Sequence, residues 1–306
     1  MHLEYWMDRL HLAYRQKAAF YAARSLVRNF PWQRWLSSLV LLCELLGCVV
    51  LDTPYTPHGQ ALDLRDYALV MVDEFEGEAL DESVWLCRSA GPRRGGYQAA
   101  SQIDVHDGNL YITGEYRENG TYGAGWYAGA VSLRERYTNG YFEIRCKCSK
   151  GTGFWSAFWL QSPVAYDHLR SKGGIGGAEI DIFEAMRAKA PTKRGQNCVT
   201  TTIHCNGWDN DEEHIDSRML GDFYVHDIYD EYNTYGLEWT QDEYIFYING
   251  VESCRSSFGK GVSTTPEEVI VSLELPEADA LRFAHDHKTQ FIVDYVKIYQ
   301  KTPIAG

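Results

Sequence analysis

From about residue 67 onward, apolar and polar residues alternate in short runs that are rich in Val, Ile, Tyr, Phe and Trp. This alternation is typical of strands with one buried face. Asp-Gly and Asn-Gly pairs, which favour tight turns, separate several runs, and no long helical pattern interrupts them. We expect strands at 68–73, 109–113, 129–133, 140–147, 154–160, 179–184, 198–204, 232–239, 243–248, 269–275 and 291–299. Many strands without helices form two packed sheets or a barrel, so the sequence predicts an all-β fold, a sandwich of the jelly-roll type.

The first 51 residues carry a different pattern. Apolar residues recur at helical spacing over 1–27, and an apolar run of 17 residues, 35–51, follows a group of arginines. The run is short for a membrane-spanning helix and contains Glu44. We expect an N-terminal helical segment over 1–51 that is an export signal, a membrane anchor or an appendage docked on the body, unless the translation start is wrongly assigned. A proline-punctuated linker over 52–66 then leads into a single β domain over 67–306.

Charge and composition narrow the possible partners. The chain of 306 residues has 29 Lys and Arg against 42 Asp and Glu, a net charge of −13, and no basic block. Nucleic acid is therefore a poor partner, and membrane contact is expected only through residues 1–51. The aromatic share of 14%, with nine Trp and 21 Tyr, favours contact with flat apolar faces. We expect a carbohydrate-active protein that is a monomer and is secreted or lies at the cell surface.

The cysteines do not form a recognisable framework. There are eight, and none is part of a Cys-x-x-Cys pair, so a zinc ribbon is disfavoured. We expect free thiols that pack as small apolar groups. One or two disulfides, from Cys198 or Cys205 to a neighbouring strand, are the alternative.

Three carboxylates within 179–184 carry the strongest chemical signal. Side chains two apart on a strand share a face, so Glu179 and Asp181 project together. Glu184 would fall on the opposite face unless a β-bulge near Ile182 adds one residue and returns it. An acidic edge strand without function is the alternative, but three adjacent like charges repel and folding does not require them. Cleavage of a glycosidic bond does require paired carboxyl groups, about 5–5.5 Å apart for double displacement.

The same run, Glu-Ile-Asp-Ile-Phe-Glu, resembles the bulged active-site strand of glycoside hydrolase family 16. Other segments that match this family in order lie at 73–75, 107–112, 141–145, 153–159, 203–208, 235–239 and 293–299. The resemblance covers roughly residues 71–300. It implies a concanavalin A-like jelly roll whose concave sheet forms an open cleft for a polysaccharide.

The resemblance also implies a role for each carboxylate. Glu179 corresponds to the family's nucleophile, Glu184 to its general acid/base, and Asp181 to the residue that hydrogen-bonds and tunes the nucleophile. No cofactor is implied for catalysis. The division agrees with electrostatics, because adjacent carboxylates cannot all ionise comfortably and one of them keeps its proton near neutral pH.

A structural calcium ion is the one metal that the resemblance implies. In the family it lies on the convex side, held by a glutamate near the first strand, a backbone carbonyl in an Asp-Gly-Asn turn and an aspartate of the last strand. The matching residues here are Glu74, Gly108 and Asp294. Carboxylate and carbonyl oxygens suit this hard cation. The alternative is that Asp294 only ends a hydrogen-bond ladder.

Several aromatic and polar residues are candidate substrate contacts. Trp155 and Trp159 are four apart in a strand-like run, and the small Ala157 between them leaves room for a sugar ring on each indole. Alternatively, both indoles fill the core. His204 follows a strand and could bond a sugar hydroxyl or orient Asp181. The other candidates are Trp126, Trp208, Trp239 and Arg145, the last of which an ion pair within the sheet would explain nearly as well.

The predicted function is endo-acting, retaining hydrolysis of internal β-linkages in a polysaccharide. A β-1,3- or mixed β-1,3/1,4-glucan is the first predicted substrate, and a β-linked galactan is the second. Two departures from the family pattern speak against a laminarin-type site, namely Ala130 in place of an arginine that grips glucose and Ser156 in place of a proline. A transglycosylase with the same carboxylates stays an alternative. A non-catalytic carbohydrate-binding jelly roll is less favoured, because all three carboxylates are present.

Overall fold

The computed structural model describes residues 56–186, 197–205, 216–275 and 288–302. Residues 1–51 and the start of the linker lie outside the described residues, so the N-terminal helical segment and the domain boundaries stay predictions. Within the described part of the chain, no helix is both long enough and apolar enough to cross a membrane.

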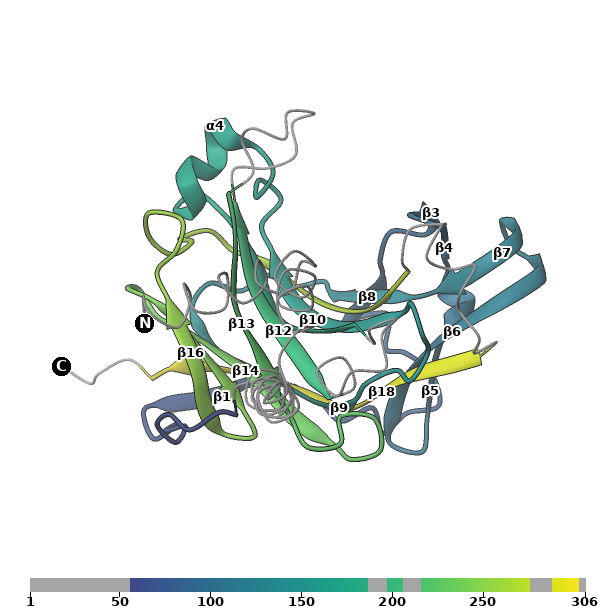
Figure 1. Cartoon of the computed structure of the whole chain (residues 1–306), viewed down its shortest axis with the longest axis horizontal. Helices are drawn as coiled ribbons and strands as arrows, with labels where there is room; N and C mark the ends of the chain where they lie inside the picture. Colours follow the sequence, from purple (N-terminus) through teal and green to yellow (C-terminus); the bar gives the residue numbers. More distant parts are fainter. Residues whose placement is uncertain (1–55, 187–196, 206–215, 276–287, 303–306) are drawn as a thin grey trace, which may run out of the picture. The chain divides into compact units, whose positions relative to one another are not determined.

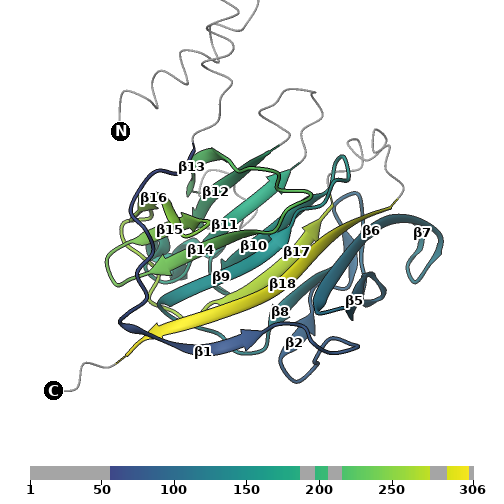
Figure 2. The ribbon, with the colours of Figure 1, turned by 90° about the horizontal axis from the view of Figure 1, so that it is seen from below.

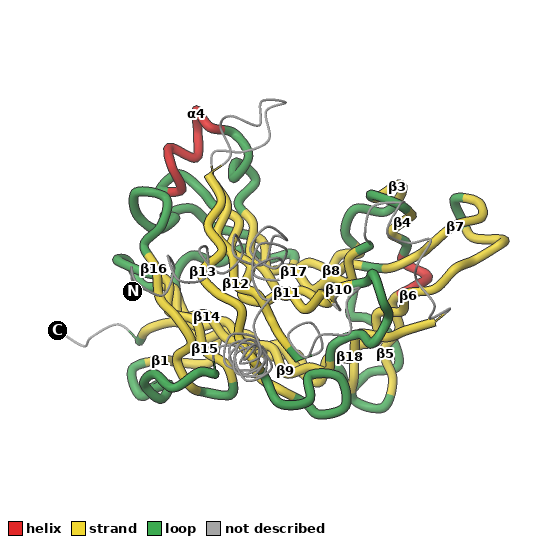
Figure 3. The backbone as a smooth tube through the Cα atoms, viewed as in Figure 1, coloured by secondary structure: helices red, strands yellow, loops and turns green. Residues whose placement is uncertain are grey.

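Strands make up most of the described chain, and helix is confined to short segments, as Figure 3 shows. The helical segments are η2 (Ala100–Gln102), α4 (His168–Ser171) and η3 (Lys172–Gly174). The strands are β1 (Tyr67–Asp73), β2 (Trp85–Cys87), β3 (Gly91–Arg93), β4 (Gly96–Gln98), β5 (Ile103–His106), β6 (Asn109–Gly120), β7 (Gly123–Ala128), β8 (Ala130–Leu133), β9 (Gly140–Lys147), β10 (Trp155–Gln161), β11 (Glu179–Met186), β12 (Cys198–Cys205), β13 (Asp216–Tyr224), β14 (Asn233–Trp239), β15 (Tyr244–Ile248), β16 (Val251–Ser256), β17 (Glu268–Glu274) and β18 (Lys288–Lys301).

These strands form two sheets that pack as a jelly-roll sandwich (Figure 2). Sheet A has seven strands in the order β13-β12-β11-β10-β17-β8-β2. Sheet B has eleven, with β16-β15-β14-β9-β18-β6-β7-β4-β3 in line, β1 beside β18 and β5 beside β6. In Figure 1, β12 and β13 rise on one side of β10, while β3 and β4 lie on the other. Sheet A presents its outer face, turned away from sheet B, between these two flanks.

Every run that the alternation predicted is a strand, and β9 coincides with the predicted 140–147. Two of the predicted turns have the backbone that their glycines suggest. The pairs Asp107-Gly108 and Asn249-Gly250 have positive φ at both residues, which suits tight hairpins. They join β5 to β6 and β15 to β16. The prediction missed β2, β3, β4, β5, β7, β13 and β16.

The core lies between the sheets and takes one face of each long strand. On β9, for example, Phe142, Ile144 and Cys146 are buried in it, while Glu143 and Arg145 lie on the outer face of sheet B. All six described cysteines are free thiols, as predicted, and Cys146, Cys148 and Cys205 are buried, whereas Cys87 is exposed. Burial of large aromatic rings from both sheets is the main stabilising term of such a core.

Candidate active site

Strand β11 carries the three carboxylates on the outer face of sheet A. The register between β11 and β10 shifts between Phe158 and Trp159, which leaves Ile182 as the extra residue. The register against β12 shifts in the same place, between Asp181 and Glu184. The predicted β-bulge is confirmed, and it returns the last carboxylate to the face of the other two.

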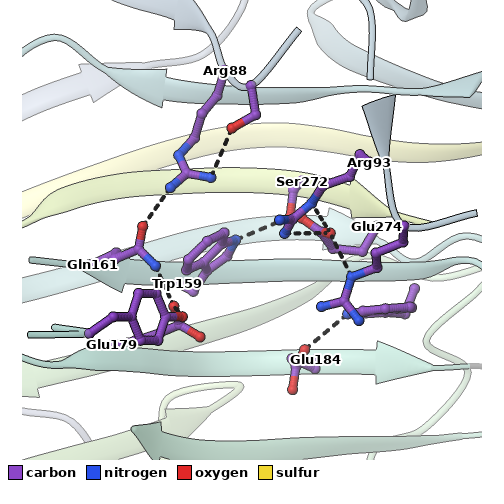
Figure 4. Close-up of polar contacts among 12 residues, drawn as sticks. Arg88, Arg93, Trp159, Gln161, Glu179, Glu184, Ser272 and Glu274 are labelled. Carbon is purple, nitrogen blue, oxygen red and sulfur yellow. Dashed lines mark hydrogen bonds and ion pairs between the residues drawn. The ribbon is translucent and has the colours of Figure 1, made fainter. Parts of the chain in front are cut away.

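Glu179 lies half-buried at the start of β11. Its Oε2 accepts a hydrogen bond from Nε2 of Gln161 at 2.5 Å (Figure 4). It accepts another from the hydroxyl of Tyr166. Neither donor was predicted from the sequence. Gln161 continues the face of Trp155 and Trp159 by one step along β10, so the alternation could have revealed it. Tyr166 lies in the loop before α4, where no periodicity pointed to it.

Asp181 is buried beside His204, whose Nε2 is 3.2 Å from the Oδ2 of Asp181. Nδ1 of His204 makes a 2.6 Å hydrogen bond with the hydroxyl of Ser217, which fixes the ring. Burial, and then the charges of Glu179 and Glu274, raise the pKa of Asp181 well above its ordinary value. Among the described residues, one group of three side chains could together hold a metal ion. It consists of Glu179, Asp181 and His204, whose potential ligand atoms lie within 4.8 Å of one another. The contact with Asp181 is one of the two predicted for His204, and the other, with a sugar hydroxyl, stays a prediction.

Glu184 completes the group. Its Oε1 accepts a hydrogen bond of 2.9 Å from the indole nitrogen of Trp155. Burial, and then the charge of Asp181, raise the pKa of Glu184 from 4.5 to about 8. A carboxyl group with this pKa holds its proton at neutral pH and can give it to a leaving oxygen.

Trp155 and Trp159 lie on the outer face of sheet A in a small cluster with Ala157 and Ile270. They do not fill the core between the sheets, but they are only 3% and 6% exposed. Their indole rings are covered by guanidinium groups. Arg94 lies 4.8 Å from the ring centroid of Trp155 and Arg88 lies 4.9 Å from that of Trp159. The two indoles are therefore not the open platforms for sugar rings that the sequence predicted.

A group of three arginines from the segment between β2 and β4 reaches this face, and sequence analysis did not single them out. Arg88 donates to the Oε1 of Gln161 at 2.5 Å. Arg93 donates to Glu274 at 2.9 Å, as Figure 4 shows, and Nε of Arg94 is 3.8 Å from the same carboxylate. The carboxylates of β11 therefore share their surface with three guanidinium groups, two of which lie beside Glu274.

Two other predicted contacts lie away from the carboxylates. Trp239 is 1% exposed in the core, and its indole nitrogen donates to the carbonyl of Ser263 at 3.1 Å. Arg145 lies on the outer face of sheet B, where it pairs with Asp294. Neither side chain can face the carboxylates, so both predictions need correction. Trp126, on β7 of sheet B, packs edge-on against Phe154, so its contact with substrate stays a prediction, and Trp208 lies outside the described residues.

The residues proposed for calcium are engaged with cations. Glu74 pairs with Lys297 at 2.9 Å, and Asp294 pairs with Arg145 at 2.5 Å. Gly108 lies in the turn between β5 and β6. A divalent ion would have to replace both basic side chains, so this arrangement does not fit the ion.

We therefore expect that EDTA leaves the thermal midpoint of unfolding unchanged and that added calcium has no effect. Differential scanning fluorimetry of the metal-stripped and calcium-loaded protein measures both. A midpoint that falls with EDTA and recovers with calcium, but not with magnesium, would restore the calcium site.

Comparison with known proteins agrees with this geometry. A family model described as "Beta-porphyranase A-D, GH16 domain" matches residues 69–301. Beta-porphyranase B of Zobellia galactanivorans is 27% identical over 219 residues, which are 65% of this chain and 69% of that protein. A beta-glucanase of Acetivibrio thermocellus is 22% identical over 240 residues, 77% of this chain and 62% of that protein. The structure of a kappa-carrageenase of Zobellia galactanivorans superposes with a TM-score of 0.64 at 20% identity, covering 81% of this chain and 100% of that one.

The family model spans most of the chain and includes the bulged strand with its carboxylates. The structural likeness supports the jelly-roll fold independently of the motif. Both findings agree with the family that the active-site strand resembles. The chain is a member of glycoside hydrolase family 16, an endo-acting glycosidase of polysaccharides.

Proposed function

We propose that the protein cleaves internal β-linkages by double displacement, with Glu179 as nucleophile and Glu184 as general acid/base. The observation that carries this proposal is the bulge in β11, because it sets both carboxyl groups on the outer face of sheet A. Glu184, with a pKa of about 8, would protonate the leaving oxygen and then take a proton from the incoming water. Asp181, whose pKa is also raised, would keep its proton and stay neutral beside Glu179.

We further propose that the substrate is an anionic β-galactan of the porphyran type, a sulfated chain. A protein with a net charge of −13 repels an anionic polymer, so binding would require a local concentration of positive charge. Arg93 and Arg94 place two guanidinium groups beside the carboxylates. Guanidinium groups suit sulfate esters because their planar fork can donate two parallel hydrogen bonds. The match to a porphyranase model supports the same substrate class.

A β-glucan is the second candidate, and the β-glucanases among the relatives favour it. The absence of an arginine at Ala130 and the covered rings of Trp155 and Trp159 speak against a site built around neutral glucose units. The two candidates share the catalytic carboxylates and differ only in what lines the flanks of the site.

The test is to incubate the enzyme with each of five polysaccharides and to size the products by chromatography. The five are porphyran, agarose, κ-carrageenan, laminarin and lichenan. We expect porphyran to yield a ladder of oligosaccharides, and the Glu179→Gln variant to yield none. Arg94→Gln should lower kcat/KM on porphyran about tenfold to a hundredfold, because the substrate loses a charged hydrogen bond. On chemically desulfated porphyran the same variant should have nearly the kcat/KM of the wild type. Cleavage of laminarin or lichenan alone would replace the galactan by a glucan.

A further inference from the structure

We propose that Arg88 and Gln161 form a positioning pair that fixes which oxygen of Glu179 attacks the substrate. This inference rests on the proposed function, in which Glu179 is the nucleophile. It concerns residues that neither the active-site motif nor the comparisons point to.

The two oxygens of Glu179 have different surroundings. Oε2 accepts hydrogen bonds from Gln161 and from Tyr166, whereas no donor to Oε1 is found among the residues that the structure describes. Burial and the charge of Glu179 raise the pKa of Tyr166, so its hydroxyl keeps its proton and stays a donor. Oε2 is thus occupied on two sides, and Oε1 is the oxygen with a free lone pair.

Arg88 determines how the amide of Gln161 is turned. A glutamine amide has a donor end and an acceptor end, and its oxygen would repel Glu179 if the group were reversed. A guanidinium group can only donate, and Nη2 of Arg88 lies 2.5 Å from Oε1 of Gln161. The amide oxygen must therefore face Arg88, which directs the NH₂ group toward Glu179, as Figure 4 shows.

Arg88 is itself held on several sides. Its backbone nitrogen donates to the carbonyl of Ala130 at 2.8 Å. Its guanidinium lies 4.9 Å from the ring centroid of Trp159, and its Nε is 3.6 Å from Glu268. The side chain is only 18% exposed. An arginine fixed in this way loses little entropy when it holds Gln161 in place.

The arrangement divides the two oxygens between two tasks. In the first step a lone pair of Oε1 forms the bond to the anomeric carbon, while the electron pair of the breaking glycosidic bond goes to the leaving oxygen, which Glu184 protonates. In the second step water attacks, Glu184 takes its proton, and the carbon–Oε1 pair returns to Glu179. Gln161 and Tyr166 stabilise the negative charge at Oε2 before the first step and as it returns in the second.

The test is a double-mutant cycle on Gln161→Met and Arg88→Met, with pH–rate profiles of kcat/KM on the preferred polysaccharide. Each single variant should lower kcat about tenfold to a hundredfold, as expected for a charged hydrogen bond. Each should also move the acid limb of the profile to higher pH, because a carboxylate that loses a donor ionises less readily. The double variant should be no worse than the poorer single variant, because Arg88 acts through Gln161.

Arg136→Met is the matched control, because Arg136 also lies near Glu268, at 3.5 Å, but does not hold Gln161 as Arg88 does. It should keep the wild-type profile. If Arg88→Met does not fold, Arg88→Lys, which keeps one donor, should recover part of the rate relative to Arg88→Gln. Independent losses that multiply in the double variant, or an acid limb that does not move, would overturn the proposal and make Arg88 a direct substrate contact. Full activity of Glu179→Gln would instead overturn the proposed function itself.

Discussion

Glu179→Gln is expected to abolish turnover on every substrate, including aryl glycosides with good leaving groups. A neutral amide cannot attack the anomeric carbon, so the glycosyl-enzyme never forms. Losses on the order of 10⁴-fold or more are usual when a nucleophile is removed. The change is nearly isosteric and relieves the charge that raises the pKa of Asp181, so the fold should be retained. Initial rates on polysaccharide and on an aryl glycoside, with circular dichroism as the check on folding, measure this directly.

The same proposal fixes the stereochemistry of the wild-type product. Two successive inversions keep the β configuration, so proton NMR should show the β-anomer first and the α-anomer only as the sugar mutarotates. Asp181→Asn is the matched variant, since it should lower the rate without erasing it. An α-anomer as the first product would mean inversion, and the roles of all three carboxylates would then be wrong.

The catalytic strand could be predicted because its chemistry follows directly from local spacing. Alternation puts Glu179 and Asp181 on one face, and a single extra residue is the only local way to add Glu184. The strands themselves were predictable for the same reason, because a half-buried strand repeats every two residues. Strands β3 and β13 escaped for different reasons, since Gly91–Arg93 is too brief to show a period and Asp216–Tyr224 has few buried positions.

The substrate contacts were predictable only in part. Alternation shows which residues share a face of a strand, but not whether that face packs into the core or lies at the active site. Trp239 shares its face with Tyr235 and Leu237, and this face packs into the core. Arg145 does face outward, but from the other sheet. The arginines above the indoles come from a segment about 70 residues earlier in the chain than Trp159, and no local pattern predicts such a long-range contact.

Glu184→Gln should behave differently from Glu179→Gln, and the difference depends on the leaving group. Polysaccharide cleavage should fall by about 10²- to 10⁴-fold, because an alcohol leaves poorly without a proton. An aryl glycoside with an acidic phenol needs little protonation, so its glycosylation step should be nearly unchanged. Burst kinetics that release one equivalent of phenol and then slow down would measure this, since the second step still lacks its base. Equal losses on both substrates would show that Glu184 is not the acid.

The pH dependence of the wild-type enzyme tests the same assignment without a mutation. Glu184 must be protonated for the first step, and burial beside Asp181 raises its pKa to about 8. The protonated form therefore predominates below that pH, and kcat/KM on polysaccharide should decline about tenfold per pH unit above it. The basic limb should be absent for an activated aryl glycoside and for Glu184→Gln, because neither depends on that proton. A basic limb that persists in Glu184→Gln must belong to another group, and Asp181, whose pKa is also raised, would be the residue to examine next.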